Sequence, residues 1–540
     1  MKFIYKFFFL LVCITLISSC AKTGRPDGGP RDELAPLFVT SKPPYETINF
    51  SSKEIELKFN EFIKLKDLNK QLVVSPPLKN PLLITPQGTA SKFLTIEILD
   101  TLAINTTYIF NFGNAIEDNN ESNKLEGFKY VFSTGSYIDS LETTGTVTDA
   151  FLSEKPKKTN IVLYRLDSTF TDSIIYKKKP NYVTTAIDTT KFNFTNLKKG
   201  KYLLLALEET SSDYIFNPTV DKIGFYRDTI RLPKDSILTK PIKLFKEIQP
   251  YQFRRAKEAF KGKIEFGYEG EIKDLKVKLL SKVSDSFRSI SKFEIDKDTL
   301  NYWHTPIAVD SLNFIVSNDI FRDTVTVQFR KNKLDSLKIT PSTKGTLHLR
   351  DTFFFKSNNP IVKIDTSKIV FINKDTLRVK YASYNSKKEN KIGFIFDKKQ
   401  KETYNITALP GSFTDIYTLK NDTLNYRFKT IELEDYGRIT LNIENTASKN
   451  LIIDLLSGKN NDEIIERKYI RASETIVFNL LEPKTYVVRA IVDDNNNKKW
   501  DTGNYLRKEL PENVIYYKEE LKVRANYFLE GNTFTIKRTD

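Results

Sequence analysis

Several stretches of the chain alternate apolar and polar residues with a period of two, and this pattern limits the possible folds more than any other feature. Successive side chains of a strand point to opposite faces, so each stretch has one apolar and one polar face. Turn residues separate the stretches at short intervals, which is typical of antiparallel β-sandwiches. The sequence therefore predicts an all-β chain. In the N-terminal part the apolar positions are Ile55, Leu57, Phe59, Leu94, Ile96, Ile98, Tyr108, Phe110 and Phe112.

At 540 residues the chain is too long for one hydrophobic core, so the sequence predicts several domains in tandem. The first, residues 36–136, resembles the bacterial Ig-like domain named after the surface-layer protein SbsA. That domain is a structural or adhesive module, and the resemblance implies no catalytic residues. It rests on Pro43-Pro44, Ile55–Phe59, Val73–Pro77, Thr107-Tyr108, Ile116–Asp118 and Phe132–Thr134.

A second unit, residues 140–247, resembles the prealbumin-like sandwich of carboxypeptidase regulatory domains and Cna B-type repeats. The resemblance rests on the strands Asn160–Tyr164 and Tyr202–Ala206, with Phe192–Leu197 and a Gly200 turn between them. Residues 431–540 look like a second copy of this unit, which is evidence of an internal repeat. In the ungapped central part of the two copies, Phe478, Leu481, Tyr486 and Ala490 match Phe194, Leu197, Tyr202 and Ala206.

The remaining two segments complete a predicted order A-B-C-A-B. Residues 346–430 look like a divergent copy of the first domain, because Tyr404, Asp415 and Thr430 repeat the order of its landmarks. Residues 248–345 are expected to form a β domain of uncertain type, in which Pro250–Phe260 is the one expected helix. Sandwiches in tandem predict a rod with exposed strand edges and loops.

The N-terminus has the order of a signal peptide, residues 1–19, with Lys2 and Lys6 before an apolar run that is too short to span a bilayer. Ile17–Cys20 resembles the lipobox of bacterial lipoproteins, which implies acyl chains on Cys20. The alternative is an ordinary signal peptide with a chance cysteine. Residues 20–35, rich in glycine and proline, are expected to be a lipidated tether. By the resemblance to lipoproteins, Ala21 in place of an aspartate implies the outer membrane, and the lack of an acidic cluster directly after Cys20 implies its periplasmic face.

Composition excludes several classes of protein. The chain has two cysteines, Cys13 in the signal peptide and Cys20, so no thiol is left for a disulfide or a zinc site. The net charge of +16 is dispersed among acidic residues, whereas a nucleic-acid binder concentrates its basic residues. The two histidines, His304 and His348, are far apart in sequence and are expected to be packed or surface residues. No nucleotide-binding or hydrolase motif is present, so the sequence predicts no catalytic residue.

One loop in the last copy has the spacing of a calcium site. Side-chain oxygens at positions one, three, five and nine, with a carbonyl at seven, match an EF-hand loop. Position six is Lys498 instead of glycine, and position twelve is Asn504 instead of glutamate. The alternative is a metal-free hairpin rich in Asx turns. The predicted ligands are Asp493, Asn495, Asn497, Lys499 and Asp501, and a weaker second loop in the earlier copy has Glu209, Ser211, Asp213 and Asn217. Phe216 occupies the position in the earlier copy that corresponds to Trp500. Each of these aromatic side chains is expected to plug the sandwich below its loop by packing into it.

A recurrent triplet of Asp, then Ser or Thr, then an aliphatic residue or Thr resembles an O-glycosylation sequon used on exported proteins by some Gram-negative bacteria. The alternative is structural, because Asp turns the chain and Thr then begins a strand. The triplets begin at Asp100, Asp139, Asp167, Asp172, Asp188, Asp228, Asp235, Asp298, Asp310, Asp323, Asp335, Asp375 and Asp422.

Two functions are compatible with these features. The first is a non-enzymatic, lipid-anchored outer-membrane scaffold or spacer that binds a protein complex or an envelope polymer. The second is a carbohydrate-binding or carbohydrate-processing lipoprotein. The sequence favours the first, because no segment between the sandwich patterns is long enough for a catalytic domain. The predicted scaffold requires no cofactor, and Ca²⁺ is an optional ligand.

Overall fold

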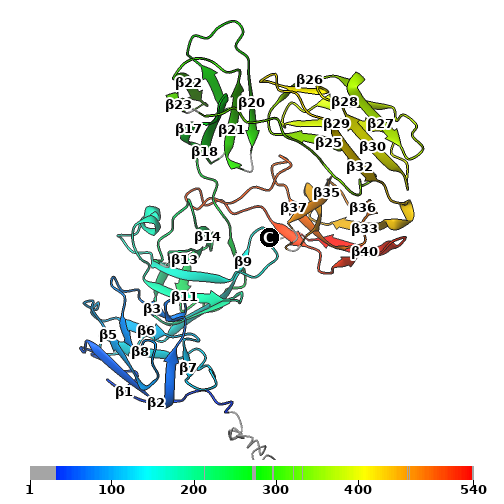
Figure 1. The fold of residues 1–540 in the computed structure, drawn as a ribbon. Coiled ribbons are helices and arrows are strands. Elements are labelled where there is room, and N and C mark those ends of the chain that lie inside the picture. The colour runs from blue at the N-terminus through cyan, green and yellow to red at the C-terminus, as the bar shows by residue number, and fades with distance from the viewer. Residues whose placement is uncertain are drawn as a thin grey trace, which may run out of the picture.

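The computed structural model describes residues 32–537, apart from Ser212, 271–274, 295–296, Ile320, Lys331, Lys459 and Asn461. Five β-sandwiches follow one another along the chain (Figure 1). Each consists of two facing sheets with an apolar cluster between them. The prediction of an all-β chain of tandem antiparallel sandwiches is confirmed.

The first sandwich packs a sheet ordered β1-β2-β5-β4 against a sheet ordered β3-β6-β8, and β7 pairs with the end of β2. The predicted alternation holds, because Ile55, Leu57 and Phe59 are at most 1% exposed in the core. The elements are β1 (Phe38–Lys42), β2 (Glu54–Leu65), α2 (Leu68–Gln71), β3 (Val73–Ser75), β4 (Leu83–Thr85), β5 (Ser91–Glu97), β6 (Thr107–Asn111), β7 (Ile116–Asp118) and β8 (Lys129–Ser133).

The second sandwich packs a sheet ordered β11-β10-β13-β14, with β15 on β13, against a sheet ordered β12-β9-β16. Its first sheet is apolar on both faces: Ile161 and Leu163 point into the sandwich, and Val162 and Tyr164 belong to a second cluster on the outer face. The elements are β9 (Leu141–Asp149), β10 (Lys158–Arg165), the 3-10 helix η1 (Asp172–Tyr176), β11 (Tyr182–Ile187), β12 (Lys191–Leu197), β13 (Gly200–Glu208), β14 (Lys222–Phe225), β15 (Ile230–Leu232) and β16 (Ile242–Leu244).

The third sandwich packs a sheet ordered β17-β18-β21-β20 against a sheet ordered β19-β22-β23. The helix expected at Pro250–Phe260 is wrong, because this segment is strand β17. Two irregularities in its pairing with β18, at Phe253/Arg255 and Glu258/Phe260, each insert an extra residue and turn a period of two into a helix-like spacing. The strands are β17 (Gln252–Phe260), β18 (Lys263–Glu269), β19 (Lys276–Leu279), β20 (Ser289–Glu294), β21 (Thr299–His304), β22 (Ser311–Ser317) and β23 (Arg322–Gln328).

The fourth sandwich packs a sheet ordered β24-β25-β29-β28 against a sheet ordered β27-β30-β32, with a small β26-β31 pair. Its first strand precedes residue 346, where the sequence pattern places the start of this domain. The elements are β24 (Ile339–Pro341), β25 (Phe353–Ser357), β26 (Ile361–Ile364), the 3-10 helix η3 (Thr366–Lys368), β27 (Ile369–Asn373), β28 (Tyr381–Asn385), β29 (Lys391–Phe396), β30 (Thr403–Ala408), β31 (Phe413–Asp415) and β32 (Leu424–Lys429).

The fifth sandwich packs a sheet ordered β35-β34-β37-β38, with β39 on β37, against a sheet ordered β36-β33-β40. Its last strand runs parallel to its first, as β16 does to β9 in the second sandwich. The elements are the 3-10 helix η4 (Leu433–Asp435), β33 (Gly437–Asn445), β34 (Leu451–Ser457), β35 (Glu463–Ile470), β36 (Glu474–Leu481), β37 (Thr485–Val492), β38 (Val514–Tyr516), β39 (Leu521–Lys522) and β40 (Phe528–Ile536).

The first and fourth sandwiches share a strand order and two local hydrogen-bonding patterns. The hydroxyl of Tyr108 accepts from Ala103 N at 2.9 Å, and that of Tyr404 accepts from Lys399 N at 2.8 Å, in each case five residues earlier. Thr134 Oγ1 then donates to Ala103 O at 2.6 Å, as Thr430 Oγ1 does to Lys399 O at 2.5 Å. These bonds explain why the sequence landmarks recur in both segments.

The second and fifth sandwiches are related in the same way. Tyr202 donates its hydroxyl hydrogen to Lys198 O, and Tyr486 donates to Glu482 O, both at 2.8 Å and both four residues back along the chain. Both tyrosines are at most 2% exposed. In both domains the turn before this strand is therefore stabilised by the hydroxyl of the equivalent tyrosine.

The sandwiches do not form the expected rod, because the chain folds back on itself. Figure 1 shows the third sandwich at the top, the fourth at the right and the fifth returning to the second. Hydrogen bonds join three of the junctions: Tyr417 OH to Gly262 O at 2.9 Å, His348 Nε2 to Leu480 O at 2.7 Å and Tyr516 OH to Phe151 O at 2.7 Å. The second and third sandwiches are joined by the connector between β16 and β17, where Gln249 Nε2 donates to Pro218 O at 3.0 Å. Sandwiches two to five thus form a closed ring.

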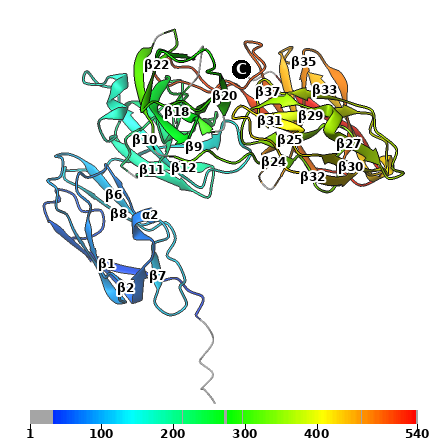
Figure 2. The same cartoon turned by 45° about the horizontal axis from the view of Figure 1, so that its top comes forward.

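The first sandwich projects from this ring as an arm (Figure 2). It contacts the second sandwich through β3, where Val183 N donates to Ser75 Oγ at 3.1 Å and Val73 joins the outer apolar cluster of the second sandwich. The arm carries residue 32, where the described part of the chain begins.

Candidate functional site

The predicted signal peptide at 1–19 and the predicted lipidation site Cys20 lie outside the described residues, as does most of the tether at 20–35. Within the part of the chain that the structure describes, no helix is long and apolar enough to cross a membrane. Lipidation of Cys20 therefore stays a prediction.

The loop predicted to bind calcium follows β37, and its side chains converge on one another. Asn495 Nδ2 and Asn497 Nδ2 both donate to Asp501 Oδ2, at 2.5 and 2.7 Å. The buried Asp493 carboxylate accepts from Asn497 N at 3.0 Å and from Lys498 N at 2.9 Å. The four predicted side-chain ligands thus bond to one another or to the backbone of the loop, which Asx turns stabilise.

Glu512, which the sequence interpretation missed, closes this loop from the segment just before β38. Its carboxylate accepts from Asp494 N at 2.8 Å and from Asp501 N at 3.0 Å, and burial raises its pKa. Among the described residues no group of three or more His, Cys, Asp or Glu side chains could hold a metal ion. The predicted site depends on asparagine and carbonyl oxygens in addition to its two carboxylates, so Ca²⁺ binding stays a prediction.

The equivalent loop of the second sandwich is organised around Glu209. Its carboxylate accepts from Asn160 Nδ2 at 2.8 Å and from Tyr214 N, and burial raises its pKa. Ser211 Oγ donates to Glu209 at 3.2 Å, whereas Asn217 Oδ1 accepts from Thr219 N at 3.1 Å. Asp213 accepts from Ile215 N at 2.9 Å. The four predicted residues therefore bond mainly to their own local backbone.

The last loop continues from Trp500 into a segment that docks on the second sandwich. Phe216 does fill the outer cluster of its own sandwich, but Trp500 packs on that same cluster of the second sandwich, where its ring centroid is 4.7 Å from that of Phe151. The expectation that Trp500 plugs the sandwich below it is therefore wrong. The connection through residues 502–513 is long enough to carry this segment across to the neighbouring domain.

Tyr505 is the centre of this docking contact and is fully buried. Its ring meets Phe225 edge-on at 5.8 Å between centroids, and its hydroxyl donates to Asp172 Oδ1 at 3.1 Å. Its backbone N–H donates to Glu247 Oε1 at 2.6 Å, and burial raises the pKa of that carboxyl. Gly503 permits this approach, because a Cβ there would lie 2.7 Å from the Phe245 ring. The docking contact therefore combines apolar burial with satisfied polar groups.

Beside it, a buried carboxylate holds two arginines on the outer face of the fifth sandwich. Asp454, 0% exposed, accepts from Arg467 Nε at 2.6 Å and from Arg489 Nη2 at 2.6 Å. The Arg489 guanidinium lies 4.1 Å from the ring centroid of Phe151, a cation–π contact across the junction. We call Asp454, Arg467 and Arg489 the Asp454 cluster.

The repeat could have revealed this cluster. In the second sandwich Val162 pairs with Val183 and Leu205; in the fifth, Asp454 pairs with Arg467 and Arg489 in the same register. Three neighbouring positions that are apolar in the second sandwich are therefore charged in the fifth. Charged residues at positions that the other copy fills with valine and leucine were the available signal.

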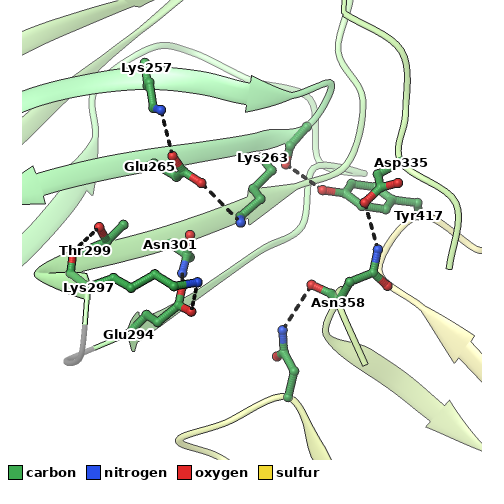
Figure 3. A network of polar contacts seen from close by, with 12 residues as sticks. Lys257, Lys263, Glu265, Glu294, Lys297, Thr299, Asn301, Asp335, Asn358 and Tyr417 are labelled. Carbon is green, nitrogen blue, oxygen red and sulfur yellow. Dashed lines mark hydrogen bonds and ion pairs between the residues drawn. The ribbon is translucent and has the colours of Figure 1, made fainter. Parts of the chain in front are cut away.

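The junction between the third and fourth sandwiches is also polar (Figure 3). Asn358 Nδ2 donates to Asp335 Oδ2 at 2.9 Å, and Glu265 lies between Lys257 and Lys263, at 3.1 and 3.4 Å. Beneath these groups Trp303, Ile416 and Tyr417 form a small apolar cluster. This junction thus has the mixed character of the one formed by Tyr505.

Neither histidine is placed for catalysis. His304, 1% exposed, is stacked between Phe287 and Phe329, and burial lowers its pKa. His348 donates from Nε2 to Leu480 O and accepts at Nδ1 from Arg350 N, so it is neutral and structural, and burial lowers its pKa too. Both histidines are packed residues, in line with the sequence interpretation.

These features define a tandem β-sandwich protein, and its first sandwich matches a known family. The family described as bacterial Ig-like domain matches residues 32–134, in agreement with the expected Ig-like domain there. No curated protein matches the sequence. This tandem Ig-like β-sandwich architecture is consistent with a structural role.

Solved structures with tandem β domains show weak similarity. Domains 1–6 of the surface layer protein SbsC are 10% identical, with 91% of this chain and 68% of that chain covered and a TM-score of 0.17. Domains A168–A170 from titin are 11% identical, with 45% and 93% covered and a TM-score of 0.14. TM-scores of this size support no inference about function.

Proposed function

We propose that the chain is a non-enzymatic, lipid-anchored scaffold of the outer membrane, on its periplasmic face, that binds an envelope protein complex or an envelope polymer. The observation that carries the proposal is the closed ring. Three of its four junctions carry both hydrogen bonds and ring or apolar packing between the domains, and the fourth is the short connector between β16 and β17, so the domains keep a fixed relative arrangement. A scaffold needs such fixed geometry, whereas a simple spacer does not.

Capture of the partner tests this function. Crosslinking in intact cells, followed by purification from native membranes and mass spectrometry, should recover a stoichiometric envelope protein or polymer. Recovery of a bound glycan together with glycan turnover by the purified chain would instead favour a carbohydrate-processing lipoprotein. Recovery of the chain alone would contradict the scaffold.

Substitution of Cys20 tests the predicted lipid anchor. Changing Cys20 to alanine should release the exported chain from membranes, because that one residue would carry all the acyl chains, each buried methylene of which contributes ~0.8 kcal/mol. Fractionation after a high-salt wash measures the release, and Ser19→Ala is the control that keeps the cysteine. Membrane retention of the Cys20 variant would show that the lipid is not the anchor.

Calcium is proposed as a structural ligand of the loop from Asp493 to Asp501. With two carboxylates among its ligands, we expect a Kd of roughly 10⁻⁴–10⁻³ M, in the range of extracellular modules. Titration calorimetry on the full mature chain without Cys20 should show binding, and millimolar Ca²⁺ should raise the melting temperature. Asp493→Ala with Asp501→Ala should abolish both effects.

Asp494→Ala is the matched control for this experiment. Asp494 lies in the same loop but pairs with Lys449 at 2.8 Å and is not a predicted ligand. The control should therefore bind Ca²⁺ as the wild type does. Absence of heat and of any thermal shift in the wild type would show that the loop is only a turn.

A further inference from the structure

A groove of about 420 Å³ opens between the two sheets of the fourth sandwich, along β27 and β28. Ile369, Phe371, Val379 and Tyr381 form its apolar floor, and Arg378 and Lys380 lie on its rim. Both cationic side chains are exposed, and within the described chain neither has an ion-pair partner. Ligand sites in proteins typically occupy ~300–1,000 Å³, so this groove has the size of a binding site.

The first sandwich shows what fills the same place when the chain itself closes it. There the connector between β3 and β4 packs Leu78 and Leu82 against the core. In the fourth sandwich the corresponding connector, residues 374–380, packs Val379 against the core and leaves Leu377 64% exposed. The connector of the first sandwich thus packs two leucines against its core, whereas the corresponding connector of the fourth packs only Val379.

The walls of the groove can bind a peptide backbone. β28 pairs with β29 on one side, and β27 pairs with β30, so each is the outermost strand of its sheet. The hairpin after β27 covers the outer edge of Phe371–Asn373, through Val379 N to Phe371 O at 2.9 Å, Asn373 N to Leu377 O at 3.0 Å and a bridge between Ile372 and Arg378. The free edge in the groove is therefore that of β28 and of the first residues of β27. The free backbone groups of such edges accept an added extended segment, which gains affinity from main-chain hydrogen bonds and specificity from side-chain pockets.

We propose that this groove binds an extended acidic peptide of a partner protein, with leucine anchors on the apolar floor and carboxylates on Arg378 and Lys380. We infer leucines in the peptide because Leu78 and Leu82 pack on the core of the first sandwich. We infer acidic residues because Arg378 and Lys380 on the rim have no ion-pair partner among the described residues. The proposal deepens the scaffold function, on which it rests, by naming the chemistry of the partner. Peptide binding is measured on the purified chain, so its failure is distinct from failure of the lipid anchor.

The test uses the full mature chain without Cys20 and an end-blocked peptide of sequence DDLSNPLED, which keeps the spacing of Leu78 and Leu82. Fluorescence anisotropy should show saturable binding. Arg378→Glu with Lys380→Glu should weaken it by about tenfold or more, and Ser383→Trp, which fills the groove, should do the same. A peptide with serine in place of both leucines should bind at least tenfold more weakly.

The control variant is Lys387→Glu with Lys388→Glu, which makes the same charge change on exposed residues outside the groove of the same sandwich. It should bind within twofold of the wild type, and the melting temperature of every variant should match the wild type. Absence of binding, or equal loss in the control variant, overturns the proposal. Binding of palmitate in the groove without binding of the peptide also overturns it, because the occupant would then be an amphiphile.

Discussion

Replacing Asp454 by alanine should lower the free energy of unfolding of the fifth sandwich by about 3–5 kcal/mol, because it leaves two arginines without their buried counter-ion. Arg489 is 3% exposed and cannot turn to water, and its other neighbours, the Phe151 ring and the Tyr516 hydroxyl, carry no negative charge. Removing one partner of a buried ion pair is costly even when the intact pair contributes little net stability.

Urea unfolding measured by tryptophan fluorescence reports this effect. The chain has two tryptophans, and Trp303→Phe leaves only Trp500, which lies at the docking contact beside the Asp454 cluster. Trp303→Phe keeps an aromatic ring in the cluster with Ile416 and Tyr417 and removes a buried indole N–H that has no hydrogen-bond partner among the described residues, and it serves as the reference for all variants measured by fluorescence. The control is Glu463→Ala, an exposed position of β35 in the same sheet, which should change stability by less than about 0.5 kcal/mol.

A third variant separates the ion pairs from the packing. Asp454→Val with Arg467→Val and Arg489→Leu installs the residues that the second sandwich has in the same register. Stability should return to the wild-type value or exceed it, as is common when apolar residues replace a buried ionic cluster. If the single Asp454 variant is as stable as the wild type, the cluster is not buried in solution and the docking contact is open.

The second large effect is expected for Tyr505→Ala, which should open the ring. The substitution removes a fully buried aromatic ring from a cluster of the second sandwich, and such truncations cost about 3–5 kcal/mol. The loss falls on one junction, so the five sandwiches should stay folded. Small-angle scattering should show a larger radius of gyration, and Trp500 emission should shift to the red as that side chain becomes solvated.

Two substitutions bracket this result. Tyr505→Phe keeps the ring and loses only the hydrogen bond to Asp172, so the ring of sandwiches should stay closed. Tyr527→Ala removes a tyrosine that is 51% exposed in the same sandwich and should change neither signal. An unchanged radius of gyration and emission spectrum for Tyr505→Ala would mean that the junction is held elsewhere.

The sandwiches and their repetition could be predicted because they depend on inward-facing residues. The alternation at Ile55, Leu57 and Phe59 and the matched tyrosines Tyr202 and Tyr486 serve the core of a single domain, and each copy needs them for the same local reason. The predicted loop after β37 also converged, because Asx turns are local. The one wrong secondary-structure prediction, a helix in place of β17, arose because two bulges break the period of two in that strand.

The arrangement of the domains could not be predicted by analogy between copies, because outward-facing residues differ. In the first sandwich the paired Ile109 and Val131 are buried on the sheet that faces the second sandwich. Asn405 and Arg427 form the equivalent pair in the fourth sandwich, and Arg427 is exposed there. The fifth sandwich therefore does not pack on the fourth as the second does on the first.

Closure of the ring also has a consequence for the order of events during biosynthesis. Tyr516 and Phe151, which meet across the junction, are 365 residues apart in sequence. At ~5–20 residues per second, a chain that emerges N-terminus first needs roughly 20–70 s to supply the second partner. Throughout this interval the outer apolar face of the second sandwich is folded without its Tyr505 cover. The order of synthesis thus leaves an apolar surface uncovered in the incomplete chain, and this surface is covered only when the last domain arrives.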